Sequence, residues 1–208
     1  MFYETAGRDE ALLPRDPFKA IVAPRPIGWI STRAADGRVN LAPYSFFNAL
    51  SSAPPIVGFS SEGCKDSASF ARDSGEFVAN LASRDLMLAM NLTSAPLPRG
   101  DSEFVHAGLT MAPCRLVKAP RVAEAHAALE CNVVEIVRLK NARGAPIDSY
   151  LVLGEVVAFH IDDTLIRNGR FDTAAAQPLA RCGYQDYAVV ESLIALARPS
   201  GGEGRNPG

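Results

Sequence analysis

Aromatic and polar side chains lie side by side between positions 42 and 48, where the sequence reads APYSFFN. On a strand, Tyr44, Phe46 and Asn48 would share one face. Ser45 would then lie on the opposite face. A buried serine or asparagine needs a hydrogen-bond partner, because leaving it unsatisfied costs about 1–3 kcal/mol. The segment therefore predicts either a backbone partner at a β-bulge or a planar heteroaromatic ligand that stacks on the rings.

A second polar segment, Lys65-Asp66-Ser67, stands at the start of a helix that we predict over 67–74. The exposed N–H groups at a helix N-terminus attract anions, and a lysine and a hydroxyl beside them add a charge and a donor. The alternative is purely structural. Asp66 or Ser67 then caps the helix, and Lys65 is solvated.

A third segment, Trp29-Ile30-Ser31-Thr32, combines hydroxyls with a β-forming pattern. Strand alternation places Trp29 and Ser31 on one face and Thr32 on the other. Hydroxyls at a strand end can meet a polar ligand. Read alone, the segment favours the simpler interpretation, in which Trp29 belongs to the core and Thr32 is a β-former.

Several common catalytic motifs are absent from the sequence. It contains no G-x-G-x-x-G after a strand, no G-x-x-x-x-G-K-[ST], no H-E-x-x-H and no G-x-S-x-G, so neither a Rossmann site nor a P-loop is indicated. The histidines His106, His126 and His160 are too dispersed in sequence to predict a metal cluster. An enzyme of this composition would take its reactivity from a cofactor.

Composition and charge exclude other classes of protein. The chain has 208 residues, 21 Lys and Arg against 23 Asp and Glu, and a formal net charge of −2, which suits one globular domain without a basic field for nucleic acid or anionic membranes. No signal peptide or membrane helix is predicted. The four cysteines are widely spaced, so we expect no disulfide or zinc site and a reducing cytoplasm.

Short strands dominate the elements that must position these segments. Asp36-Gly37 is a hairpin signal between two β-like runs. The predicted strands cover 27–33, 39–50, 56–60, 77–81, 130–139 and 150–162. Regular alternation with long helices is missing, so the pattern indicates a barrel and argues against a doubly wound sheet.

Helices are predicted to be few and short. One covers 67–74 and ends at Gly75. A second covers 84–91 with Ser83 as its N-cap, and 171–176 forms a helical turn. The expected organisation is an N-terminal arm over 1–15, a single domain over 16–195 and a flexible tail over 196–208 that is rich in glycine and proline.

Six segments follow one another with the spacing of a known family. They read RPIGWIST (25–32), NLAPYSFFNALSSAPPIVGFS (40–60), KDS (65–67), GEFVANL (75–81), GEVVAFHID (154–162) and PLARCGYQDY (178–187). Over about residues 15–192 the chain resembles the flavin reductase-like FMN-binding split-barrel family, in the subgroup of the nitrilotriacetate monooxygenase reductase component and flavoredoxin. Two positions depart from that pattern, Ser67 where threonine is usual and Cys182 where glycine is common.

This resemblance implies a mainly β fold, a six-stranded Greek-key split barrel with a few short peripheral helices, and a homodimer with FMN near its interface. The implied cofactor-binding residues are Trp29, Ser31, Thr32, Tyr44, Ser45, Phe46, Asn48, Ser61, Lys65, Asp66 and Ser67. Ser31 and Thr32 would meet the ribityl or phosphate region. Ser45, Phe46 and Asn48 would line the isoalloxazine ring. Lys65 and Ser67 would hold the 5′-phosphate, with Ser61 beside them and Arg25 as a further charge.

For the residues around the reductant, the resemblance leaves alternatives open. His160 either borders the nicotinamide pocket as the catalytic residue or is satisfied by backbone at the barrel rim. Arg181 pairs with a phosphate of the pyridine nucleotide or with an acidic neighbour. Tyr184 and Tyr187 close the site or pack in the core.

The implied activity is hydride transfer from NADH or NADPH to FMN, with reduced flavin passed to a partner monooxygenase. Two alternatives belong to other classes of function. One is an FMN-binding electron-transfer protein without NAD(P)H activity. The other is an FMN-dependent oxygenase or reductase of a small organic substrate.

Overall fold

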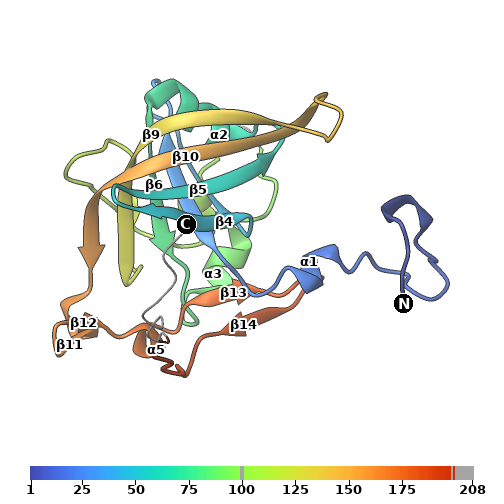
Figure 1. The fold of residues 1–208 in the computed structure, drawn as a ribbon. Coiled ribbons are helices and arrows are strands. Elements are labelled where there is room, and N and C mark those ends of the chain that lie inside the picture. Colours follow the sequence, from blue (N-terminus) through green and yellow to red (C-terminus); the bar gives the residue numbers. More distant parts are fainter. Residues whose placement is uncertain (99–100, 198, 200–208) are drawn as a thin grey trace, which may run out of the picture.

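The computed structural model describes residues 1–98, 101–197 and 199, so most of the predicted tail over 196–208 lies outside the described residues. Its main feature is a seven-stranded antiparallel sheet in the order β3-β2-β6-β9-β10-β5-β4, which curls into a barrel (Figure 1). The strands are β2 (Gly28–Arg33), β3 (Val39–Tyr44), β4 (Phe47–Ser52), β5 (Pro55–Glu62), β6 (Glu76–Leu81), β9 (Ala127–Lys140) and β10 (Pro146–Ile161). The predicted split β-barrel is confirmed, and its sheet has seven strands where six were expected.

Smaller elements surround the barrel. A three-stranded sheet joins β1 (Arg25–Pro26), β13 (Leu179–Arg181) and β14 (Tyr187–Val189), and two ribbons pair β7 (Met111–Ala112) with β8 (Arg121–Val122) and β11 (Ile166–Arg167) with β12 (Arg170–Phe171). The helices are η1 (Thr5–Gly7), α1 (Phe18–Ile21), α2 (Asp66–Ser74), α3 (Met87–Leu92), α4 (Glu103–His106), η2 (Asp163–Leu165) and α5 (Thr173–Ala176). The N-terminal residues before α1 extend away from the barrel (Figure 1). Among the described helices, none has the length and apolar character required to cross a membrane.

The chain between 39 and 52 differs from the single strand predicted over 39–50. It leaves the sheet at Ser45-Phe46, and β3 and β4 then lie at opposite edges of the sheet. The backbone N–H of Ser60 donates to the carbonyl of Phe46 at 2.8 Å. The aromatic segment is therefore the connection that crosses from one edge to the other and closes the barrel.

Gly28 on β2, which has no side chain, makes room for this crossing connection. Gly28 lies opposite Tyr44 in the β2–β3 register. A Cβ atom at Gly28 would lie 2.5 Å from Cδ2 of Phe47, so the phenyl ring packs directly on the strand backbone. Close backbone approach of this kind is a common reason for glycine inside a strand.

Local sequence signals predicted the end of α2 correctly, but they misplaced the start of α3. Helix α2 ends at Gly75 in the left-handed region with φ 75°, as predicted. Helix α3 begins at Met87, three residues later than expected. Ser83 does not cap it, because its hydroxyl donates to Asp85 and its backbone forms a bridge with Pro178. The predicted turn over 171–176 is the helix α5, which Asp172 caps by accepting from Ala175 N at 3.0 Å.

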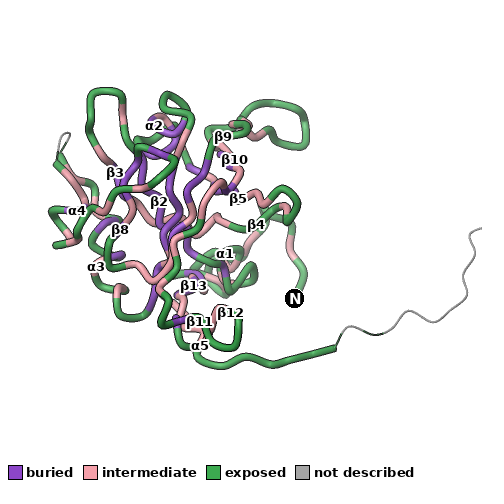
Figure 2. Tube along the Cα trace, turned by 90° about the vertical axis from the view of Figure 1, so that its left-hand side faces the viewer, coloured by how far each residue is buried: buried purple, intermediate pink, exposed green. Residues whose placement is uncertain are grey.

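Two apolar clusters stabilise the barrel on either side of β2. Inside the barrel, Ile30, Phe59 and Phe77 are fully buried beneath α2. Outside it, Trp29 and Leu41 pack with residues of α3, α4 and β13. Each fully buried large side chain contributes about 1.5–3 kcal/mol. Figure 2 shows this burial concentrated along the strands. Both faces of β2 are therefore covered, whereas the segment that follows β3 is only partly buried at Ser45 and exposed at Asn48.

Candidate functional site

A groove of about 480 Å³ lies on the outer face of the barrel beside the APYSFFN segment. Gly58 and Ser60 of β5 and Leu151 of β10 line it from the sheet, and residues 21–26 line it from the opposite side. The groove also contains Ser45, Phe46, Phe47, Asn48 and Leu50. It therefore brings together three of the predicted site residues, Ser45, Phe46 and Asn48.

The floor of this groove is shaped by Gly58. Gly58 is the register partner of Asn48 on β4 and of Leu153 on β10. A Cβ atom there would lie 2.7 Å from Cδ1 of Leu50, so the groove has no space for a larger residue. The side chains of Leu50 and Leu151 lie above Gly58 and give the groove an apolar surface. Ser45 and Asn48 place polar groups along the rim, so a planar heteroaromatic ring fits the groove.

Arg25 supplies a buried positive charge at one end of the groove. Its side chain is 7% exposed, and its Nη1 donates to the carbonyls of Lys19 and Val22. The Nε atom is buried and has no hydrogen-bond partner among the described residues. An unsatisfied buried donor costs about 1–3 kcal/mol, so an acceptor on a bound ligand would stabilise this arginine. The arginine thus fits a ligand that carries oxygen or nitrogen acceptors.

A second pocket of about 400 Å³ shares Arg25 and Ser45 with the groove. Its other lining residues are Lys19, Ile27, Pro43, Met90, Asn91, Ser94, Arg181, Gly183, Tyr184 and Tyr187. Gly183 has φ 93°, and a Cβ atom there would lie 2.7 Å from Cα of Ala20. The glycine thus lets the β13–β14 turn pack against α1. Tyr184 and Tyr187 both line this pocket, and Tyr187 also packs against the outer apolar cluster.

Two hydroxyls of the predicted phosphate region, one on β5 and one on α2, are buried between the barrel and α2. Ser67 is 1% exposed, and its Oγ accepts from Nδ2 of Asn40 at 2.6 Å. Ser61 is fully buried, and its Oγ donates to the carbonyl of Gly63 at 2.8 Å. Burial raises the pKa of the Tyr44 phenol, and hydrogen bonds with Ser67 and Ser61 partly offset it. These groups bond to one another, whereas Lys65 at the start of α2 is exposed.

The hydroxyls of β2 are likewise directed into the protein. Ser31 Oγ donates to the carbonyl of Pro120 at 2.5 Å, and Trp29 Nε1 donates to Thr93 Oγ1 at 2.9 Å. Thr32 is fully buried on the other face, and its Oγ1 has no partner among the described residues. The structure does not bring Trp29, Ser31 or Thr32 to the groove.

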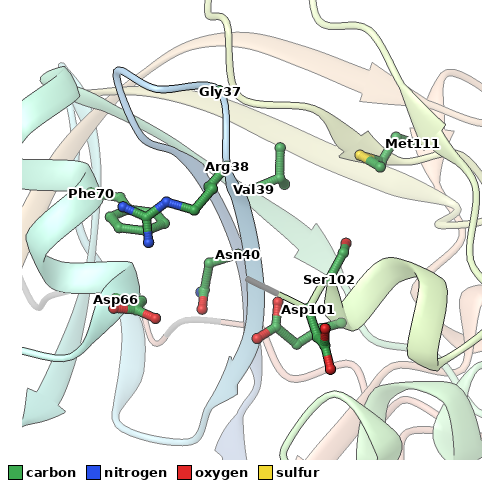
Figure 3. Close-up of a pocket in the computed structure, with 10 residues that line it drawn as sticks. Gly37, Arg38, Val39, Asn40, Asp66, Phe70, Asp101, Ser102 and Met111 are labelled. Atoms are coloured by element: carbon green, nitrogen blue, oxygen red, sulfur yellow. The ribbon is translucent and has the colours of Figure 1, made fainter. Parts of the chain in front are cut away.

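A pocket of about 250 Å³ beside the start of α2 is acidic (Figure 3). Asp66, Asp101 and Glu103 line it together with Arg38, whose guanidinium lies 5.2 Å from the ring centre of Phe70. Burial raises the pKa of Glu103, and the nearby charge of Asp66 adds to this effect. A phosphate at the N-terminus of α2 would be repelled from this side and favoured on the side of Lys65.

His160 lies in a different place and contacts groups that sequence reasoning missed. Its Nε2 is 2.6 Å from Oε1 of Glu130, a carboxylate with no exposed surface. The thiol of Cys114 completes a cluster in which the ligand-type atoms lie within 4.8 Å of one another. Three consecutive backbone N–H groups, those of Arg115, Leu116 and Val117, donate to the same carboxylate at 2.6–3.0 Å. The β9–β10 pairing brings His160 to Glu130, and the chain between β7 and β8 supplies Cys114 and the three N–H groups.

Burial and hydrogen bonds set the protonation of this cluster in opposite directions. Burial alone would raise the pKa of Glu130, but the three N–H groups and the His160 ring outweigh it and lower the pKa to about 2. Burial raises the pKa of the Cys114 thiol to about 12. The carboxylate of Glu130 accepts from three backbone N–H groups and contacts the His160 ring, so the structure shows a hydrogen-bonded polar site.

His160 is far from the groove within one chain. Both Leu151, in the groove, and His160 belong to β10, and nine residues of an extended strand span about 30 Å. His160 instead lines a polar pocket of about 610 Å³ with His126, Arg115, Arg121 and Asp162. Its imidazole is satisfied by a carboxylate and not by backbone at the barrel rim.

Comparison with known proteins agrees with this architecture. The family model of the flavin reductase like domain matches residues 22–177. An uncharacterized protein of Halalkalibacterium halodurans, BH2278, is 36% identical over 184 residues that cover 86% of this chain and 88% of that protein. Nitrilotriacetate monooxygenase component B from Bacillus cereus is similar in structure, with a TM-score of 0.85, 28% identity, and coverage of 94% and 98% of the two chains. A Shewanella frigidimarina protein with a split barrel domain has a TM-score of 0.79 at 23% identity, covers 88% and 90%, and supports the fold alone. The chain therefore belongs to the flavin reductase-like family.

Proposed function

We propose that this protein is an NAD(P)H:FMN oxidoreductase that binds the isoalloxazine ring of FMN in the groove beside Ser45-Asn48. The observation that carries the proposal is the shared wall of two cavities. Arg25 and Ser45 line both the groove and the basic pocket next to it. A ring in the groove would then lie within reach of a second molecule in the pocket. Hydride transfer requires this close placement of two reactants.

Each residue of the groove has a role that its position supports. Phe46 and Leu151 would contact the ring faces or edges through apolar surface. Ser45 and Asn48 would bond to ring oxygens and nitrogens. Lys65, exposed beside the N-terminus of α2, would attract the 5′-phosphate. FMN supplies the two-electron chemistry when bound, so the protein needs to hold and orient the reactants and needs no strong acid or base.

Anaerobic stopped-flow mixing tests the proposal directly. FMN-loaded protein is mixed with NADH and, separately, with NADPH, and flavin absorbance is followed. We expect at least one nucleotide to bleach the flavin faster than it reduces free FMN. A flavin that stays oxidised with both nucleotides would exclude the proposed activity.

We also propose that the chain passes reduced flavin to a partner monooxygenase, which the similarity to nitrilotriacetate monooxygenase component B supports. We further propose a homodimer, as the family resemblance implies. The expected measurements are a dimer mass by light scattering and release of reduced FMN into ultrafiltrate under anaerobic conditions. A monomer that retains its reduced flavin would contradict both statements.

The double substitution Ser45→Ala with Asn48→Ala separates binding from folding. We expect the affinity for FMN to fall about tenfold or more, because each side chain would lose a hydrogen bond to the ring. The free energy of unfolding should change by less than about 0.5 kcal/mol, since Asn48 is exposed and Ser45 is half-buried. Fluorescence titration and urea unfolding measure the two quantities.

A matched control uses the same residue types elsewhere. Ser52→Ala with Asn132→Ala changes two exposed positions on β4 and β9 that do not line the groove. It should leave the affinity for FMN unchanged. If the Ser45/Asn48 pair instead loses stability in proportion to affinity, these residues support the fold and do not read the ring.

A further inference from the structure

The pocket beside the groove concentrates positive charge. Its described lining includes Lys19, Arg25 and Arg181 and no carboxylate. Arg25 and Arg181 are direct register partners between β1 and β13. Like charges directly opposite each other on paired strands are destabilising. The fold thus maintains two permanent positive charges side by side at the wall of a cavity.

Backbone carbonyls and aromatic rings hold these cations in place. The Arg181 guanidinium lies 4.5 Å from the ring centre of Tyr187 and donates to the carbonyl of Tyr184. The guanidinium of Arg25 lies 5.9 Å from the ring centre of Phe46. Among the described residues, neither arginine forms an ion pair, so the acidic neighbour considered for Arg181 is not its partner.

We propose that this pocket binds an oxyanion, phosphate or carboxylate, carried by the molecule that exchanges electrons with the flavin. The proposal rests on the proposed function, because the pocket is a substrate site only if the groove beside it holds the flavin. Three observations carry it: the unbalanced charge, the like-charged register pair, and the buried Nε of Arg25 without a partner. An arginine fork matches a planar or tetrahedral oxyanion with two parallel hydrogen bonds.

The position of the pocket favours the second substrate over the phosphate of FMN itself. Ser45 joins the pocket to the part of the groove that would hold the ring. Strand β5 leads in the other direction, from Gly58 through Ser60 to the loop before Lys65. An FMN laid along β5 would place its phosphate near Lys65, which leaves the basic pocket for the other reactant.

Calorimetric titration of the purified protein with inorganic pyrophosphate and, separately, with benzoate tests the pocket without relying on activity. The variants are Arg181→Gln, the conservative Arg181→Lys, and Arg143→Gln as a control in an exposed hairpin. We expect one probe to bind the native protein and to bind Arg181→Gln about tenfold more weakly, because a charge-assisted hydrogen bond is lost. Arg181→Lys should recover part of the affinity, and Arg143→Gln should match the native protein. The probe that binds identifies the oxyanion as phosphate-like or carboxylate-like.

Kinetics provide the second readout. With the flavin saturated, the KM for the reductant should rise in Arg181→Gln while the affinity for FMN relative to riboflavin stays constant. If Arg181→Gln lowers the affinity for FMN more than the affinity for riboflavin, the pocket binds the phosphate of FMN and the proposal is overturned. Equal binding of both probes to native protein and Arg181→Gln, or no binding to either, would also overturn it. A different result would concern the proposed function alone. If anion binding depends on Arg181 but NAD(P)H does not reduce the bound flavin, only the proposed oxidoreductase activity is excluded.

Discussion

Replacing Glu130 with glutamine is expected to lower the free energy of unfolding by about 3 kcal/mol or more. The carboxylate is fully buried and accepts from three backbone N–H groups and from His160. In Glu130→Gln, an amide NH2 would face N–H donors on at least one side and leave them unsatisfied. Removing one member of a buried charged pair typically costs roughly 3–5 kcal/mol. Urea unfolding at pH 7 measures the difference.

The pH dependence of Glu130→Gln gives a second test. The pKa of Glu130 is lowered in the folded protein from 4.5 to about 2, so the folded state binds this proton less readily than the unfolded state. The stabilisation is therefore complete above pH 4.5 and is lost as the pH falls toward 2. The stability difference between the native protein and Glu130→Gln should shrink over that range.

Glu124→Gln provides the matched control for this prediction. Glu124 also accepts a backbone N–H, that of Thr110 at 2.9 Å, but in an exposed setting. The loss of stability there should stay below about 1 kcal/mol. Equal losses in the two variants, or a difference that does not change between pH 5 and 3, would show that the buried network contributes little.

Gly28→Ala is expected to cost about 1–3 kcal/mol of stability and to weaken FMN binding as well. The added Cβ atom would lie 2.5 Å from Cδ2 and 2.6 Å from Cγ of Phe47, so the ring must move. Phe47 stands between Phe46 and Asn48, which line the groove. A displaced ring therefore shifts the segment that would contact the flavin, and fluorescence titration with FMN should show the loss.

Two companion variants make this prediction specific. Gly28→Ala with Phe47→Leu removes the ring atoms that clash, and it should recover both stability and affinity in part relative to Gly28→Ala. Gly7→Ala adds a Cβ atom where no heavy atom lies within 4 Å, so it should behave like the native protein. If the changes in the free energy of unfolding from the two substitutions simply add, Gly28 and Phe47 do not interact as described.

Much of the fold could be predicted because its signals are local. Asp36-Gly37 predicted the β2–β3 hairpin, and alternation of β-branched and aromatic residues predicted β5, β6, β9 and β10 to within a few residues. Gly75 marked the end of α2 because a helix often ends in a left-handed residue. The order and spacing of six segments also indicated the family that the comparisons confirm. These inferences need only neighbours in the sequence.

The structure differed where the outcome depends on contacts between distant residues. Strand periodicity continues from Val39 to Leu50, yet the chain leaves the sheet at Ser45-Phe46 because the barrel must close and Phe47 needs the space above Gly28. The start of α3 shifted because Ser83 bonds to Asp85 and pairs with Pro178. Neither partner can be identified from local propensity.

The sequence by itself determined the mainly β class, the hairpin, the main helix and the residue types near Ser45 and Asn48. Only the tertiary structure decided which polar groups face a cavity. It buried Ser61 and Ser67 between the barrel and α2 and put Arg25 opposite Arg181. It also carried His160 away from the groove to Glu130. The physical reason is that strand register and sheet curvature set which side chains meet, and both depend on the packing of the whole barrel.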